Sequence, residues 1–280
     1  MIRRPAVAGK FYPAQPEVLI SDIQRYTAPT APTVPGAQRI AALGVVAPHA
    51  GYMYSGAVAG AVYAAVDLTP ACIILCPNHF GHGAPLSLYL EGEWETPLGR
   101  ARVDRELASA LRAAFPALLP DPAAHEREHS LEVQIPFLQR LIPDFRFVPV
   151  CIGAGDYPTL RALGEAIASV LEKLPERVLI IASSDMNHYE SDAVTRRKDR
   201  YAIDAMLALD APGLLQSLSR HNNSMCGYGP TVAMLTATRR LGANRASLVR
   251  YATSGDVSGQ LDQVVGYAGL AVWKDAAATQ

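Results

Sequence analysis

The chain has 280 residues, half of them apolar, and a formal net charge of −1 at neutral pH. This length can bury a full hydrophobic core, and the near-neutral charge gives no general attraction to nucleic acid or to anionic membranes. The N-terminal residues lack the apolar region of a signal peptide, and no apolar run reaches the roughly 18 residues that a membrane-spanning helix needs. We therefore expect a cytoplasmic protein that binds neither nucleic acid nor membrane.

Short apolar runs alternate with amphipathic stretches through most of the chain. Continuous Val, Ile and Leu runs predict buried strands near residues 40–46, 72–76, 145–151, 177–182, 247–252 and 264–273. Helical periodicity predicts helices near residues 16–26, 55–66, 103–114, 130–141, 158–173, 197–209 and 228–241. A stretch rich in Pro and Thr over residues 27–36 is too short to separate domains, and we expect it only to connect the first helix to the first strand. The pattern predicts one α/β domain over residues 1–280. We expect three layers, α/β/α, with a mostly parallel or mixed sheet in the centre.

Histidines follow two of the predicted strands directly. His49 lies in the segment Ala-Pro-His-Ala-Gly-Tyr, and His79 lies in the segment Cys-Pro-Asn-His. A lone loop histidine is more often structural or merely exposed. However, the loops that leave the carboxyl ends of parallel strands converge on one crevice, where ligands bind. Two histidines on successive loops of this kind indicate either a metal site or a nucleophilic site.

The predicted strand near 177–182 is followed by the segment Ser-Ser-Asp-Met-Asn-His, which contains Asp185 and His188. Ser and Asp are also common at helix N-termini, so capping a helix is the structural alternative for Asp185. An imidazole near a carboxylate is the usual arrangement for general acid–base catalysis. We expect His188 and Asp185 to be the catalytic pair.

Cys226 lies between Met and Gly, directly before the predicted helix at 228–241. A thiol at a helix N-terminus can be partly deprotonated and can serve as a metal ligand or a nucleophile. The alternative is a small buried side chain. We expect that role for Cys72, Cys76 and Cys151, because they lie in apolar strand runs and four cysteines do not make a disulfide framework in a chain of this length.

A Glu-His-Ser-Leu-Glu segment places His129 and Glu132 one helical turn apart. It is not the His-Glu-x-x-His pattern of zinc proteases, because the second histidine is missing. Solvent-facing polar residues are the structural alternative. We expect His129 and Glu132 at the rim of the site, together with Tyr52 and Tyr54. Dinucleotide-binding, Walker and Gly-x-Ser-x-Gly motifs are absent, which argues against nucleotide-dependent and serine-hydrolase chemistry.

Seven short motifs occur in order along nearly the whole chain. They are Ala8–Pro13, Ala47–Tyr52, Cys76–His79, Thr96–Gly99, Glu128–Glu132, Ser183–Asp185 with His188, and Cys226 with the following glycine. Taken singly they are short, but as an ordered set they closely resemble the Memo family, which is also called AmmeMemoRadiSam system protein B. That alternative name implies a pathway shared with radical-SAM and AMMECR1-like proteins.

The Memo family is similar to the LigB-type, class III extradiol dioxygenases, which hold non-haem iron(II) in an α/β fold. The resemblance implies a LigB-like fold with His49 and His79 as two ligands of one metal ion. It also implies that Cys226 stands where those dioxygenases place a carboxylate ligand, that His188 matches their acid–base histidine, and that Asp185 belongs to the pocket. A thiolate is softer and more oxidisable than a carboxylate, so the exchange favours zinc, copper or a redox-active iron.

Three functions follow from these observations, in order of preference. The first is a redox enzyme that uses iron(II) or copper and acts on an unidentified small molecule or peptide. The second is a zinc-type metallohydrolase with Asp185 or His188 as the base. The third is a protein without catalytic activity that binds a ligand or peptide in an inherited dioxygenase-like pocket. A separate alternative makes Cys226 a covalent nucleophile that His188 activates.

Overall fold

The structure is a computed structural model that describes residues 1–28, 39–153 and 155–275. Its centre is a sheet in which five neighbouring strands run parallel in the order β6, β8, β3, β9 and β2. These strands are β2 (Ala42–Ala47), β3 (Ala71–Pro77), β6 (Gly99–Val103), β8 (Arg146–Ile152) and β9 (Leu179–Ser183). The predicted connection over residues 27–36 lies outside the described residues, except for its first two positions.

Antiparallel strands extend the sheet at both edges. On the β2 side, β12 (Val264–Trp273) pairs with β2 and also with β11 (Arg245–Thr253) and β10 (His188–Glu190). On the other side, β5 (Glu93–Thr96) pairs with β6, and β1 (Ile2–Arg3) adds in parallel to β5. The end of β8 pairs with β4 (Leu86–Leu88), which pairs in turn with β7 (Leu119–Pro120). The sheet is therefore mixed, with a parallel centre.

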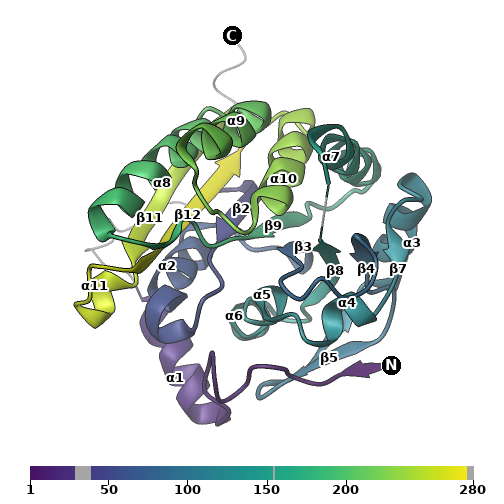
Figure 1. Cartoon of the computed structure of the whole chain (residues 1–280). Helices are drawn as coiled ribbons and strands as arrows, with labels where there is room; N and C mark the ends of the chain where they lie inside the picture. The colour runs from purple at the N-terminus through teal and green to yellow at the C-terminus, as the bar shows by residue number, and fades with distance from the viewer. Residues whose placement is uncertain (29–38, 154, 276–280) are drawn as a thin grey trace.

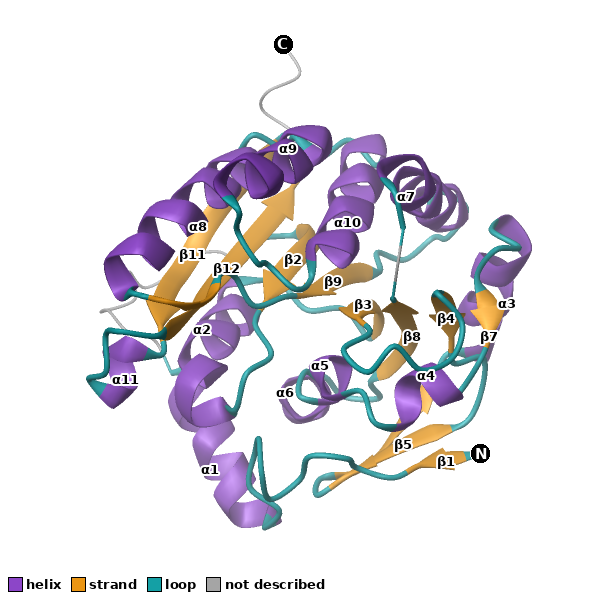
Figure 2. Cartoon of the chain, viewed as in Figure 1, coloured by secondary structure: helices purple, strands orange, loops and turns teal. Residues whose placement is uncertain are grey.

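Helices cover both faces of the sheet, as Figures 1 and 2 show. One face carries α1 (Pro16–Thr27), α2 (Tyr52–Ala65), α5 (His129–Glu132) and α6 (Ile135–Leu141). The other carries α3 (Arg105–Ala114), α7 (Tyr157–Leu171), α8 (Asp192–Leu207), α9 (Ala211–His221) and α10 (Tyr228–Arg240). The short helices α4 (Ala123–Glu126) and α11 (Gly255–Ser258) lie in connecting segments.

The apolar side chains form two clusters, one on each face of the sheet. Along β3, Ile73 and Leu75 belong to the cluster beneath α7 and α10, whereas Cys72 and Ile74 belong to the cluster beneath α2 and α6. A strand that is buried on both faces needs apolar residues at successive positions rather than at alternate ones. This explains why the strands read as continuous apolar runs, and the predicted three-layer α/β/α arrangement is confirmed.

Some predicted elements differ in detail from the structure. The predicted helix over 130–141 is divided into α5 and α6, and Pro136 lies in the first turn of the second helix, where a missing N–H is tolerated. The short edge strands were not predicted, because segments of two to four residues carry little periodicity. The helix α9 was also not predicted, although its 11 residues are amphipathic. No helix among the described residues is long and apolar enough to span a bilayer.

Candidate metal centre

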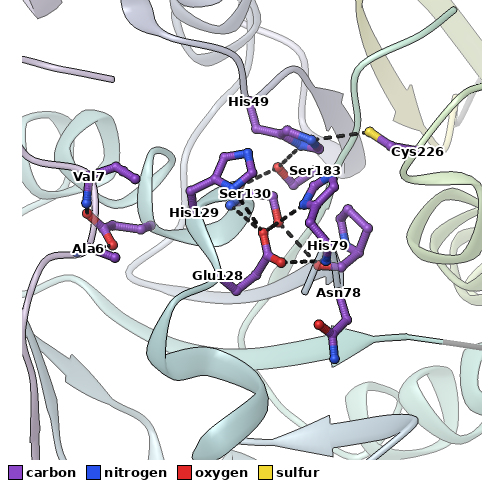
Figure 3. Close-up of polar contacts among 12 residues, drawn as sticks. Ala6, Val7, His49, Asn78, His79, Glu128, His129, Ser130, Ser183 and Cys226 are labelled. Carbon is purple, nitrogen blue, oxygen red and sulfur yellow. Dashed lines mark hydrogen bonds and ion pairs between the residues drawn. The ribbon is translucent and has the colours of Figure 1, made fainter. Parts of the chain in front are cut away.

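The carboxyl ends of β2, β3 and β9 meet at one edge of the sheet, because the three strands are parallel neighbours. The loops that follow them, together with α5 and the segment before α10, enclose a cavity of about 550 Å³. Its lining includes His49, His79, His129, Asp185, His188 and Cys226. The structure therefore brings together the residues that the sequence predicted as ligands and catalytic groups, and Figure 3 shows the polar contacts among several of them.

Three imidazoles lie close enough to share one ion. One ring nitrogen from each of His49, His79 and His129 can be chosen so that all three lie within 4.8 Å of one another. The rings of His79 and His129 are stacked with centroids 4.7 Å apart, and His49 lies edge-on to both. Imidazole nitrogen is a common ligand for zinc, copper and iron, so the donor set suits a transition metal.

The tautomer of His49 follows from its hydrogen bonds. Its Nδ1 lies 3.0 Å from the Ser183 hydroxyl, which donates its own proton to the Ser130 carbonyl at 2.6 Å. The Ser183 oxygen must therefore accept from the His49 Nδ1–H, as it also does from the Gln134 amide at 2.9 Å. This leaves Nε2 with a free lone pair, 3.2 Å from the Cys226 sulfur. Burial and the neighbouring imidazoles lower the pKa of His49, which keeps the ring in the neutral form that binds metals.

Glu128 holds His79 in place through two contacts. One carboxylate oxygen accepts the His79 backbone N–H at 2.7 Å, and the other lies 2.9 Å from Nδ1 of the ring. Ser130 donates two further hydrogen bonds to Glu128, from its backbone and its hydroxyl. A carboxylate behind one ring nitrogen, with the other nitrogen left free, is the usual support for a metal-binding histidine. Glu128 was not predicted to have this role.

Burial and the contacts between these groups shift the pKa values of His79, Glu128 and His129. Burial acts to lower the pKa of His79, but the hydrogen bond and the charge of Glu128 outweigh it, and the pKa is raised. Burial acts to raise the pKa of Glu128, but the contacts with His79 and Ser130 hold it far below its usual range. Burial lowers the pKa of His129, with the neighbouring His79 acting in the same direction. Glu128 is thus a permanent anion that His79 and His129 both contact.

Asp185 is a buried carboxyl group that lines the cavity. Its Oδ1 accepts the His49 backbone N–H at 2.7 Å, and burial raises its pKa to about 7. The alternative role as a helix cap is wrong, because the chain continues into β10 and the next helix begins only at Asp192. In the part of the chain that the structure describes, no hydrogen bond joins Asp185 to His188. The His188 ring lines the cavity, and burial lowers its pKa.

Cys226 is half-buried, and the following residue, Gly227, is the N-cap of α10. A Cβ atom at Gly227 would lie 2.3 Å from the Ser183 carbonyl oxygen, so only glycine allows the loop to approach β9 this closely. Burial raises the pKa of the Cys226 thiol, and the Asp185 carboxyl group adds to this effect. Burial thus opposes the effect that the sequence interpretation expected from the helix N-terminus.

The four residues predicted for the rim of the site lie elsewhere in the structure. His129 belongs to the imidazole group itself. Glu132 is buried behind the cavity, where it forms an ion pair with Arg3 at 2.7 Å. Tyr52 is also buried, because its ring packs in the apolar cluster and its hydroxyl donates to the Val133 carbonyl. Tyr54 is half-buried and does not line the cavity. Phe11 and Tyr189, which sequence analysis did not select, line it instead.

Comparisons with known proteins identify one family over nearly the whole chain. A family model described as Memo-like protein matches residues 3–271. A MEMO1 family protein of Methanosarcina barkeri is 44% identical over 97% of this chain and 100% of its own length. One of Methanopyrus kandleri is 45% identical over 96% and 98% of the two chains. A crystal structure of an uncharacterized protein from Escherichia coli K12 covers 80% of this chain and 98% of its own at 12% identity, with a TM-score of 0.50, and therefore shares the fold alone.

Proposed function

Because the chain belongs to the Memo-like protein family, we propose that it is a metal-dependent redox enzyme whose metal ion is bound by His49 and His79. One observation carries this proposal. The Nδ1 atoms of both rings are hydrogen-bonded, to Ser183 and to Glu128, so that both Nε2 atoms remain available to a ligand. Histidines that bind metals are oriented by such outer contacts.

Two side chains compete for the third position. His129 offers a nitrogen within the 4.8 Å group, and the Cys226 sulfur lies 3.2 Å from Nε2 of His49. The family resemblance favours Cys226, whose thiol would lose its proton when it binds the ion. We propose His49, His79 and Cys226 as the ligands, with His129 as a further imidazole against the Glu128 carboxylate.

Two imidazoles and a thiolate suit iron, copper or zinc. We propose iron(II) or copper, because the resemblance to the extradiol dioxygenases points to an ion that can change its oxidation state. A bound ion of this kind would supply activation of oxygen or single-electron transfer. Asp185 and His188 handle protons in the proposal. The pKa of Asp185, about 7, lets the carboxyl group hold or release a proton near neutral pH, and the lowered pKa of His188 keeps its ring neutral and able to accept one.

A zinc hydrolase is the second candidate, since three imidazoles within 4.8 Å also suit catalytic zinc. Asp185 would then be the group that accepts a proton from a nucleophilic water. The two candidates share the same residues and differ in whether the ion can change its oxidation state.

The cellular setting is part of the same proposal. Four free cysteines, three of them buried, support a reducing compartment such as the cytoplasm. The substrate is a small molecule or peptide, and the pathway is shared with radical-SAM and AMMECR1-like proteins, as the family name implies.

Metal analysis of protein purified without oxygen tests the proposal. Stoichiometric iron or copper is expected in the wild type, with loss of the metal in His49→Ala, His79→Ala and Cys226→Ser. Retention in Cys226→Ser but loss in His129→Ala would assign the third position to His129. Zinc in the same pattern would establish the hydrolase candidate. No metal in the wild type, and no uptake of iron, copper or zinc, would overturn both candidates and leave a binding protein.

A further inference from the structure

Tyr189 has an unusual backbone conformation for its residue type. Its φ is +59°, in the left-handed region that bulky side chains rarely adopt. Its side chain is also 72% exposed, more than that of any other aromatic residue in the described part of the chain. The positive φ costs folding free energy, and the exposed ring lies outside the two apolar clusters.

Contacts on both sides hold this conformation in place. In the pairing of β10 with β12, His188 lies opposite Val265 and Glu190 lies opposite Val264, so the register shifts at Tyr189. The Ser224 hydroxyl accepts the His188 backbone N–H at 2.8 Å. A β-bulge beside a binding site typically redirects a side chain. Here the chain is held both before and after the bulged residue, Tyr189.

The bulge directs Tyr189 to the cavity of the candidate metal centre. Tyr189 lines this cavity, and its ring centroid lies 5.6 Å from that of His188. Phe11 lines the same cavity and packs on His129 with centroids 4.8 Å apart. The cavity therefore has an exposed aromatic ring beside the imidazole of the predicted acid–base residue.

Two hydrogen bonds to Glu190 hold the chain directly after Tyr189. Lys198 and Asn187 each donate to the same carboxylate oxygen of Glu190, at 2.5 Å and 2.7 Å. Relaxing Tyr189 into an ordinary strand conformation would shift the register and break these contacts. Strained residues of this kind persist at ligand-binding sites, where surrounding structure enforces them.

We propose that Tyr189 is a specificity-determining residue that receives a flat, weakly polar group of the ligand as it enters the metal pocket. An aromatic ring stacks on planar groups, and a bound ligand would cover the apolar surface that the free protein leaves exposed. The inference rests on the proposed metal site, because the ligand is held at one end by the ion and at the other by the ring.

A pair of metal-binding probes separates these two contacts. Acetohydroxamate and benzohydroxamate share one chelating group, but only the second carries a phenyl ring. Calorimetric titration of each into zinc-loaded protein gives the ratio of their affinities. In Tyr189→Ala, the affinity for benzohydroxamate is expected to fall by about 2- to 10-fold, which corresponds to the interaction energy of one aromatic pair. The affinity for acetohydroxamate should be unchanged. Tyr189→Phe should keep the wild-type ratio.

Tyr201 supplies the matched control. It is an exposed tyrosine on α8 whose ring stacks on His221, and it does not line the cavity. Tyr201→Ala should leave both affinities at the wild-type values. An unchanged ratio in Tyr189→Ala would overturn the inference while leaving the metal site intact. Failure of both probes to bind the wild type would overturn the metal site, and the inference with it.

Thermal unfolding tests the strain without any ligand. Glycine adopts a positive φ freely, so Tyr189→Gly should raise the melting temperature by about 2 °C, whereas Tyr189→Ala, which keeps a Cβ atom, should not. A lower melting temperature in Tyr189→Gly than in Tyr189→Ala would show that the positive φ costs no folding free energy for a residue with a Cβ atom, which contradicts the proposed strain.

Discussion

Two glutamates on opposite ends of one short helix have opposite roles. Glu128 caps α5 and faces the metal pocket, whereas Glu132 ends α5 and faces the N-terminal segment. Both are almost fully buried. Glu128 leaves its histidine partners with a free ring nitrogen, whereas both oxygens of Glu132 are occupied by four donors that do not line the metal pocket. Burial and charge therefore do not identify a functional acid; the unused bonding capacity around it does.

The Glu132 cluster shows what a fully bonded buried charge looks like. One carboxylate oxygen accepts from the Val7 backbone and the Tyr12 hydroxyl, and the other accepts from Arg3 and the Ala6 backbone. The Arg3 guanidinium also donates to three backbone carbonyl groups and lies 4.1 Å from the Trp94 ring centroid. Each oxygen of Glu132 thus accepts two hydrogen bonds from within the protein, so we assign this cluster to stability.

The largest expected effect is on the free energy of unfolding, from a substitution in the Glu132 cluster. Glu132→Ala leaves the Arg3 charge buried without its partner, and we expect a loss of about 3–5 kcal/mol in the free energy of unfolding, measured with denaturant. Glu95→Gln removes an exposed ion pair of the neighbouring Arg4 and should cost less than about 1 kcal/mol. Equal effects of the two substitutions would remove the distinction drawn between the two glutamates.

The next effect is on metal affinity. His79→Ala removes a proposed ligand, and the affinity for the metal should fall by more than about a hundredfold, because loss of an outer contact alone costs about 10–100-fold. Circular dichroism should show that the variant is folded. His221→Ala, on α9, is the matched control and should bind the metal as the wild type does. Wild-type affinity in His79→Ala would place the metal elsewhere.

A smaller effect is expected from Glu128→Gln. The amide keeps the size of the side chain but removes the charge that orients His79, so the metal affinity should fall by about 10–100-fold. Competition with a coloured chelator measures it. Glu126→Gln alters an exposed acid of α4 and should have no effect. An equally small change in both variants would show that Glu128 is structural, as Glu132 is.

The smallest effect concerns a further buried acid, Asp199, whose hydrogen-bond partners are all neutral groups. It accepts from the Tyr251 hydroxyl, the Asn187 backbone and the Asn223 amide, and burial raises its pKa. Its folded pKa exceeds the unfolded one, so its favourable contribution is complete below the unfolded pKa and is lost as the pH rises through the folded value. Denaturant unfolding from pH 4 to pH 7 should show Asp199→Asn gaining stability relative to the wild type. The opposite trend would mean that the neutral donors stabilise the anion.

The sequence by itself determined the layers of the fold and the neighbourhood of the site. Short continuous runs of Val, Ile and Leu are typical of strands that are covered on both faces, and the loops after parallel strands meet at one edge of the sheet. This is why His49, His79 and Asp185 could be placed together without coordinates. Cys226 could be added to this group because its segment also predicts a loop that leads into a helix.

Only the tertiary structure decided what each polar group does there. The contacts of Glu132 with Arg3 and of Glu128 with His79 join residues that are 129 and 49 positions apart, and no local pattern encodes such pairings. The same is true of His129, which the helix could have turned toward solvent. Periodicity fixes which face of an element is apolar, but the partner of a buried polar group depends on segments that meet only after the chain has folded.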